Sequence, residues 1–226
     1  MSILYIPTTS RERSDCEALT TMYELGGDIG QGAYGKVRQA CRRGTADCDY
    51  VLKIIKYDHS LYLDSGGMKR SLDQTIDEWE KEVEVMRKLN EAQDSLDVVF
   101  SPKLHDAWYC KKGDDLEFYL LMEKFDGDLR SIINNNIGLE DSKASLILIL
   151  RHLYAYLIII HKECHICLND IKLENILYRK THQGELQFVF ADFGKATLYS
   201  DEDCIRIDRE SFKRHINTFI KLIGSS

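Results

Sequence analysis

The stretch CLNDIKLENIL, residues 167–177, decides how this sequence is interpreted. It sets three polar side chains, Asp170, Lys172 and Asn175, among apolar residues. Two strand-like runs follow, NILYRK and ELQFVFAD, with a His-Gln-Gly turn between them, and together they predict a hairpin. Asp192 closes the second run, in the segment ADFGKA, so the hairpin brings Asp192 and Asn175 to the same edge. Polar side chains that meet there predict a functional site.

Length and composition indicate a folded protein. The chain has 226 residues, 44% of them hydrophobic, which is enough for one large domain or two small lobes. Its net charge is −7, and no run of Lys or Arg is longer than a pair. A nucleic-acid-binding surface would need a concentrated positive charge, so we expect no nucleic-acid partner.

The cysteines indicate a reducing compartment. There are seven, an odd number, and the first segment lacks the apolar run of a signal peptide. We therefore expect reduced thiols in an intracellular protein, cytoplasmic or nuclear. Cys164 and Cys167 form one CxxC, but no second pair of ligands stands at similar spacing, so free thiols are favoured over a zinc site.

The most apolar run, ASLILILRHLYAYLIIIH, covers residues 144–161. Arg151 and His152 lie in its middle, where they would be costly in lipid, and the run is short for a membrane span. We expect a buried helix and no membrane association.

The order of elements predicts a β-rich region followed by a mainly helical one. Residues 1–22 are polar and of mixed charge, as in a loosely attached leader. Short β-like runs broken by turns predict an antiparallel meander over 23–56, and apolar residues spaced by three and four predict an amphipathic helix over 73–92. After two further strand-like runs, a long apolar helix is expected at about 141–162 and an amphipathic one at 206–223.

The segment GQGAYGKV, from Gly30 to Val37, has the pattern G-x-G-x-x-G. The residues after Gly35 alternate like a strand, whereas a dinucleotide-binding fingerprint would continue as a helix. Two strands joined by a glycine turn can fold over nucleotide phosphates, because backbone N–H groups then approach the oxygens. An ordinary glycine-rich hairpin is the alternative.

Lys53 lies inside the apolar run VLKII, where its ammonium must find an anion or extend to solvent. In the helix predicted at 73–92, Glu82 shares the apolar face with Trp79 and Met86, so it points inward. Glu82 is therefore the candidate partner of Lys53, and the other glutamates of this helix are expected to be solvated.

Taken in order, these motifs resemble a eukaryotic-type protein kinase over roughly residues 23–220. The series is GxGxxGxV, V-x-K, a helix with one inward Glu, LLMEKFDGDL, NDIKLENIL and ADFGKA. The resemblance implies a bilobal α+β fold, with a β-rich lobe at 23–125 and a truncated, mainly helical lobe at 126–226.

The resemblance also implies ATP and Mg²⁺ as cofactors and a role for each motif residue. The residues implied at the nucleotide are Gly30, Gly32 and Gly35 over the phosphates, Val37 on the adenine, Lys53 on the α- and β-phosphates, Met122 as gatekeeper, Glu123 and Phe125 through their backbone, and Asp128 or Asp126 on the ribose. Lys53 is expected to pair with Glu82. Asp170 would orient the substrate hydroxyl, Lys172 would neutralise the γ-phosphate, and Asn175 and Asp192 would hold magnesium.

The chain departs from the family pattern before and after these motifs. Leu168 and Asn169 replace a His-Arg pair whose Arg commonly contacts a phosphorylated activation loop, so we expect activity that is not gated by loop phosphorylation. No Ala-Pro-Glu segment follows Asp192, and Asp208 would tie the last helix to the catalytic loop. The chain thus resembles compact RIO-type kinases and the small kinase of the KEOPS complex. Kinases of large DNA viruses are another candidate group.

The spacing D-x-K-x-x-N resembles that of kinases that phosphorylate serine or threonine in a protein substrate. Because the usual peptide-docking region is short, a partner protein is expected to supply docking. One alternative is a kinase-like pseudoenzyme, a scaffold or kinase inhibitor that binds nucleotide without efficient transfer. A small-molecule kinase is the third hypothesis.

Overall fold

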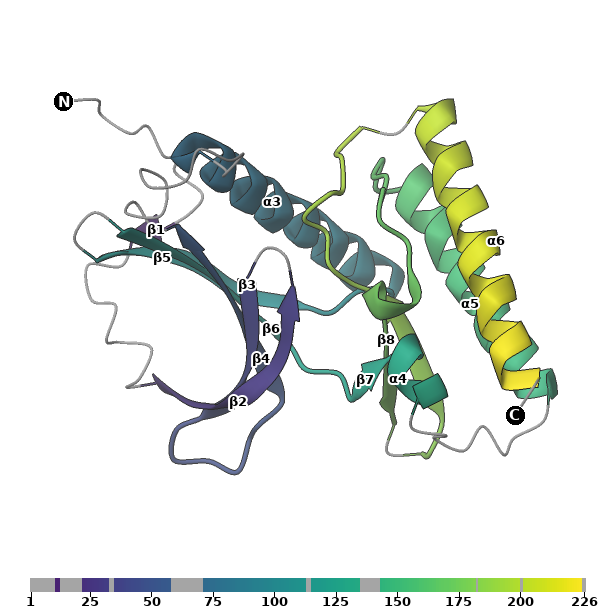
Figure 1. Ribbon diagram of the computed structural model, residues 1–226, viewed down its shortest axis with the longest axis horizontal. Coiled ribbons are helices and arrows are strands. Elements are labelled where there is room, and N and C mark those ends of the chain that lie inside the picture. The colour runs from purple at the N-terminus through teal and green to yellow at the C-terminus, as the bar shows by residue number, and fades with distance from the viewer. Residues whose placement is uncertain are drawn as a thin grey trace. The chain divides into compact units, whose positions relative to one another are not determined.

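The computed structural model describes residues 11–12, 22–32, 35–57, 71–112, 115–134, 143–181, 183–199 and 201–224. The chain divides into two compact units, whose elements Figure 1 labels. The first unit comprises residues 1–83 and 103–124, and the second comprises residues 84–102 and 125–226. The first is built on a sheet and the second is mainly helical, so the expected α+β class is confirmed.

In its described residues, the first unit contains a six-stranded sheet in the order β1-β5-β6-β4-β3-β2. Its strands are β1 (Arg11–Glu12), β2 (Tyr23–Gly32), β3 (Gly35–Arg42), β4 (Tyr50–Tyr57), β5 (Leu104–Lys112) and β6 (Asp115–Glu123). The β2, β3, β4, β6 and β5 strands are joined by antiparallel pairings, as the predicted meander requires.

The β1 strand changes the interpretation of the predicted leader. It pairs in parallel with β5, where Arg11 is opposite Trp108 and Glu12 is opposite Tyr109. Residues 11–12 are therefore part of the sheet and not a loose attachment. Apart from Met22, the rest of the predicted leader lies outside the described residues.

The sheet is stabilised by apolar side chains buried on its central strands. One cluster joins Ala40 on β3, Leu52 on β4, Trp108 on β5 and Tyr119 on β6, each at most 5% exposed. The rings of Trp108 and Tyr119 stack with centroids 5.3 Å apart. Aromatic pairs of this kind stabilise neighbouring strands beyond the area that they bury.

Helix α3 (Leu72–Leu96) begins at a reciprocal cap that the sequence S-x-x-Q supplies. The Gln74 backbone N–H donates to the Ser71 hydroxyl, and the Ser71 N–H donates to the Gln74 side-chain oxygen. Trp79 and Met86 on the predicted apolar face are each 1% exposed. The helix extends four residues beyond the predicted end at residue 92.

The boundary between the units differs from the one expected at residue 125. Residues 84–102, the second half of α3 and the segment after it, belong to the second unit. The side-chain oxygen of Gln93 accepts the N–H groups of Phe100 and Ser101, and the Phe100 carbonyl accepts the N–H of Phe190 on β9. These buried hydrogen bonds attach the segment to the hairpin of the second unit.

In its described residues, the second unit contains the second half of α3, a three-stranded sheet in the order β7-β8-β9, and helices α4, α5 and α6. Its elements are β7 (Gly127–Asp128), α4 (Leu129–Asn134), α5 (Lys143–Lys162), the short 3-10 helix η1 (Leu173–Asn175), β8 (Ile176–Lys180), β9 (Leu186–Phe190) and α6 (Glu202–Gly224). Helices α5 and α6 are in contact and run side by side in Figure 1. The apolar side chains that the structure shows buried along them include Leu153, Leu157 and Ile160 on α5, and Phe212, Ile216 and Phe219 on α6.

Helix α6 begins four residues before the predicted start at residue 206. Asp201 accepts the N–H of Cys204 at 2.7 Å, which is a side-chain cap of the first turn. Within the described part of the chain, no helix combines the length and the apolarity that crossing a membrane requires.

The cysteines differ from the expectation of reduced thiols throughout. Disulfides join Cys41 to Cys48 and Cys167 to Cys204, while Cys110 and Cys164 are buried and take part in neither disulfide. The expectation is wrong for the four paired residues because pairing depends on spatial neighbourhood, which counting does not show. The Cα atoms of Cys41 and Cys48 are 3.9 Å apart across the β3–β4 turn, and those of Cys167 and Cys204 are 6.2 Å apart.

Candidate active site

Lys53 and Glu82 form a buried ion pair in the first unit. The Lys53 Nζ lies 2.6 Å and 2.9 Å from the two carboxylate oxygens of Glu82. The residues are 8% and 3% exposed, so neither charge is well hydrated. The pair expected from the sequence is therefore present, and it fixes the ammonium at one point on β4. Breaking such a pair is costly, because the remaining charge stays buried without compensation.

We predict that Lys53→Met lowers the free energy of unfolding by about 3 kcal/mol, because it leaves the Glu82 carboxylate buried. The double variant Lys53→Met/Glu82→Leu should lose less than Lys53→Met alone, since both charges are then removed. Urea unfolding followed by circular dichroism measures both. A double variant less stable than Lys53→Met would contradict the pairing.

The glycine-rich segment forms the β2–β3 hairpin that the sequence predicts. Gly30 and Gly32 lie on β2, and Gly32 is opposite Gly35, the first residue of β3. A Cβ on Gly35 would stand 2.2 Å from the carbonyl oxygen of Ile54, so no other residue fits there without movement. Val37 is half-buried on β3, directly opposite Lys53.

Two of the residues expected near the adenine lie at the end of β6. Met122 is half-buried and opposite Val51 on β4. The Glu123 N–H donates to the carbonyl of Lys103 at 2.9 Å, and the Lys103 N–H donates to the Glu123 carboxylate at 3.3 Å. The backbone of Glu123 is thereby fixed at the point where the first unit ends.

Three further residues expected at the nucleotide, one near the adenine and two as ribose candidates, lie in the second unit and have structural contacts of their own. Phe125 is buried beneath the guanidinium of Arg179, which lies 4.8 Å from the ring centroid. The Asp128 carboxylate accepts the Ser131 N–H at 2.7 Å and so caps α4. Asp126, the less favoured ribose candidate, accepts the N–H of Lys180 at 2.8 Å. Roles at the nucleotide stay predictions for all three.

Asp170, Lys172 and Asn175 lie together in the second unit, as the resemblance to the kinase family implies. The Lys172 Nζ lies 2.8 Å from the Oδ2 of Asp170. The side-chain nitrogen of Asn175, in η1, donates to the same Oδ2 at 3.2 Å and to the Asp170 carbonyl at 2.9 Å. The amide nitrogen thus faces Asp170, and the amide oxygen, a hard ligand suited to Mg²⁺, is turned away from it.

Asp192 is brought beside Asn175 by the β8–β9 hairpin. Ile176 pairs with Phe190, and the Ala191 N–H then donates to the Asn175 carbonyl at 2.9 Å. Asp192 has φ 60, in the left-handed region that costs energy for a residue other than glycine. Asp192 offers a carboxylate and Asn175 an amide oxygen, and their backbone segments lie side by side. These two groups fit the donor set that Mg²⁺ prefers.

Sequence reasoning missed the role of Lys195, the residue after Gly194. Its Nζ lies 3.1 Å from the Oδ1 of Asp170, so the carboxylate faces two lysines. Burial raises the pKa of Asp170, but hydrogen bonds and positive charge from Lys172 and Lys195 outweigh it and hold that pKa below its ordinary value. The carboxylate is therefore ionised at neutral pH. The sequence showed this lysine in the motif ADFGKA, where it could have been considered as a partner of Asp170.

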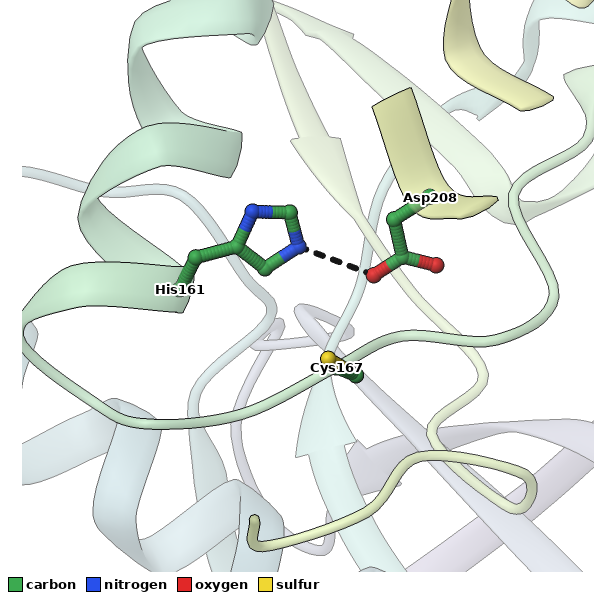
Figure 2. Close-up of side chains that lie close together, drawn as sticks. All are labelled: His161, Cys167 and Asp208. Atoms are coloured by element: carbon green, nitrogen blue, oxygen red, sulfur yellow. Dashed lines mark hydrogen bonds and ion pairs between the residues drawn. The ribbon is translucent and has the colours of Figure 1, made fainter. Parts of the chain in front are cut away.

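Asp208 ties helix α6 to the loop that carries Asp170, as expected. Its carboxylate is 1% exposed and accepts the N–H of Leu168 at 2.7 Å and that of Asn169 at 2.9 Å. Figure 2 shows that the His161 ring points at the same carboxylate, and its Nε2 lies 2.9 Å from the Asp208 Oδ2.

Cys167 lies beside this pair in Figure 2, and ligand atoms of the three residues lie within 4.8 Å of one another. That spacing suits a metal ion. However, the Asp208 carboxylate is already engaged by two N–H groups and an imidazole, and Cys167 is bonded to Cys204. The cluster therefore acts as a structural junction.

We predict that Asp208→Ala lowers the free energy of unfolding by about 3 kcal/mol, because two loop N–H groups lose their buried acceptor. The matched control is Asp203→Ala on the same helix, whose aspartate side chain is 85% exposed. It should change stability by no more than about 0.5 kcal/mol. Equal losses in the two variants, measured by urea unfolding, would contradict the junction.

Comparison with known families is consistent with this geometry. A family model described as the protein kinase domain matches residues 23–214, from the start of β2 into α6. The match spans every motif from the glycine-rich hairpin to Asp208. No curated protein matches the chain.

Proposed function

Because this chain belongs to the protein kinase family, we propose that it transfers the γ-phosphate of Mg-ATP to a serine or threonine hydroxyl of a protein substrate. The observation that best supports this is the Asp170 carboxylate held by Lys172 and Asn175, beside the backbone that carries Asp192. Phosphoryl transfer depends mainly on positioning and on charge stabilisation, and this group of residues supplies both kinds of side chain.

Each unit contributes different parts of the proposed mechanism. In the first unit, Lys53 binds phosphate oxygens and Glu82 holds its ammonium in place. In the second, Asp170 orients the attacking hydroxyl and Lys172 offsets charge on the phosphoryl group. Asn175 and Asp192 hold Mg²⁺, which offsets negative charge on the phosphate oxygens when bound.

Asn169 supports a site that does not depend on a phosphorylated activation loop. It stands where the family commonly has an arginine, and its uncharged amide donates to the Lys195 carbonyl and to the Thr197 hydroxyl, both at 3.2 Å. A neutral amide lacks the charge-assisted attraction that an arginine has for phosphate. We therefore propose that the segment after Gly194 is held by fixed hydrogen bonds.

A kinase-like scaffold that binds nucleotide without efficient transfer is the second candidate. It is favoured by Leu168 and Asn169, which replace the family's His-Arg pair before Asp170. Only residues 195–201 separate Gly194 from α6, which leaves little chain for a peptide-docking platform. We propose that a partner protein supplies docking for the substrate.

We predict that purified protein incorporates radiolabelled γ-phosphate from ATP, on itself or on a basic serine peptide, in a Mg²⁺-dependent manner. Asp192→Asn should reduce incorporation at least a hundredfold, because it removes a charged metal ligand. Asp203→Asn, at an exposed position of α6, is the matched control and should retain wild-type incorporation. Undiminished labelling in Asp192→Asn would overturn the proposed mechanism. No labelling by the wild type, with a thermal shift caused by ATP alone, would support the scaffold.

We predict that pretreatment with a phosphatase leaves the initial rate of transfer within about twofold of the untreated rate. The reason is that the contacts of Asn169 are neutral hydrogen bonds within the chain. The measurement compares treated and untreated enzyme after the phosphatase is removed. If treatment silences transfer and incubation with ATP restores it, the site is gated by phosphorylation.

A further inference from the structure

We propose that Lys195 is a positioning residue that orients the Asp170 carboxylate for the attacking hydroxyl, in place of activation-loop phosphorylation. This inference rests on the proposed phosphotransferase function. Lys195 contacts one carboxylate oxygen of Asp170 at 3.1 Å, while Lys172 contacts the other at 2.8 Å. The two ammonium groups therefore hold the carboxylate at both of its oxygens.

The hydrogen bonds that Asp170 already accepts determine which of its oxygens can accept one from the substrate hydroxyl. Oδ2 accepts from Lys172 and from the amide nitrogen of Asn175, which occupies both of its lone-pair directions. Within the described residues, Oδ1 has one hydrogen-bond donor, Lys195. One lone pair of Oδ1 remains to accept a hydrogen bond from the substrate hydroxyl. Lys195 therefore fixes the oxygen that orients this hydroxyl.

The backbone of Lys195 is itself held in place by the catalytic loop. Asn169 has φ 58, a left-handed conformation that asparagine tolerates, and its side chain donates to the Lys195 carbonyl at 3.2 Å. Its own N–H is bonded to Asp208. Two residues after Lys195, the backbone of Thr197 pairs in both directions with Cys167, at 2.9 Å and 3.0 Å. The backbone of Lys195 is therefore held in place, and its side chain extends from there to Asp170.

Charge gives Lys195 a second effect that also operates through Asp170. Lys172 and Lys195 carry two positive charges beside the single negative charge of the carboxylate. An anionic phosphoryl group that approaches this carboxylate is repelled less when the carboxylate is neutralised. The Lys195 side chain is 47% exposed, so its ion pair contributes little to folding. Its loss should therefore be visible in the rate of transfer and not in stability.

The test is a charge series at position 195, made in the full chain, with a basic serine peptide as acceptor. Lys195→Arg should keep kcat within about threefold, Lys195→Gln should lower it about tenfold, and Lys195→Glu should lower it further. The KM for Mg-ATP should stay within about twofold of the wild-type value. The midpoint of thermal unfolding should stay within about 2 °C of that of the wild type. Lys213→Gln, at an exposed position of α6, is the matched control and should behave as the wild type.

A second variant tests the link to Asn169. Asn169→Gly keeps the left-handed backbone and removes the amide, so it should lower kcat in the same direction as Lys195→Gln. The double variant should be no slower than the slower single variant, because both act through one contact. If the reduction in kcat of the double variant equalled the product of the two single reductions, this link would be overturned.

Failure of this inference is distinguishable from failure of the proposed function. An active wild type with unchanged kcat in Lys195→Gln overturns the role of Lys195 alone. A fall in stability that matches the fall in kcat also overturns it, since the lysine would then be structural. A wild type that transfers no phosphate to peptide or to itself overturns both.

Discussion

The buried carboxylate of Asp208 accepts the backbone N–H groups of Leu168 and Asn169. The position of the loop that carries Asp170 depends on this contact. The two residues immediately precede Asp170, so α6 fixes the start of the loop that carries Asp170. The β8–β9 hairpin fixes its other end, where Ala191 donates to Asn175. A loop held at both ends keeps its polar side chains in one arrangement before any substrate binds, which is what preorganised catalysis requires.

In the first unit the corresponding constraint is the ion pair between Lys53 and Glu82. Its two charges are buried, so each requires the other, and the ammonium is presented at a defined place on β4. Because Gly35 has no side chain, the start of β3 can lie close to the Ile54 carbonyl on the neighbouring strand β4. A fixed cation and a glycine hairpin in the same unit are the parts that a phosphate-binding lobe needs.

Much of this could be predicted from the sequence, because periodicity and spacing report local structure. The inward face of α3 identified Glu82, and the predicted hairpin brought Asn175 and Asp192 to one edge. The Cys167–Cys204 disulfide, the attachment of residues 84–102 and the pairing of β1 depend on contacts between distant segments, which local patterns do not contain. Lys195 was overlooked because its long side chain reaches Asp170 across 25 positions of sequence.

The central claim is that Asp170 acts as the oriented carboxylate of a phosphotransferase. The most direct measurement is the rate of γ-phosphate transfer to a serine peptide by the wild type and by Asp170→Asn, at saturating Mg-ATP. The account predicts transfer by the wild type and a loss of at least about a hundredfold in Asp170→Asn, with Mg-ATP still bound by the variant. Equal rates in the two proteins would contradict it.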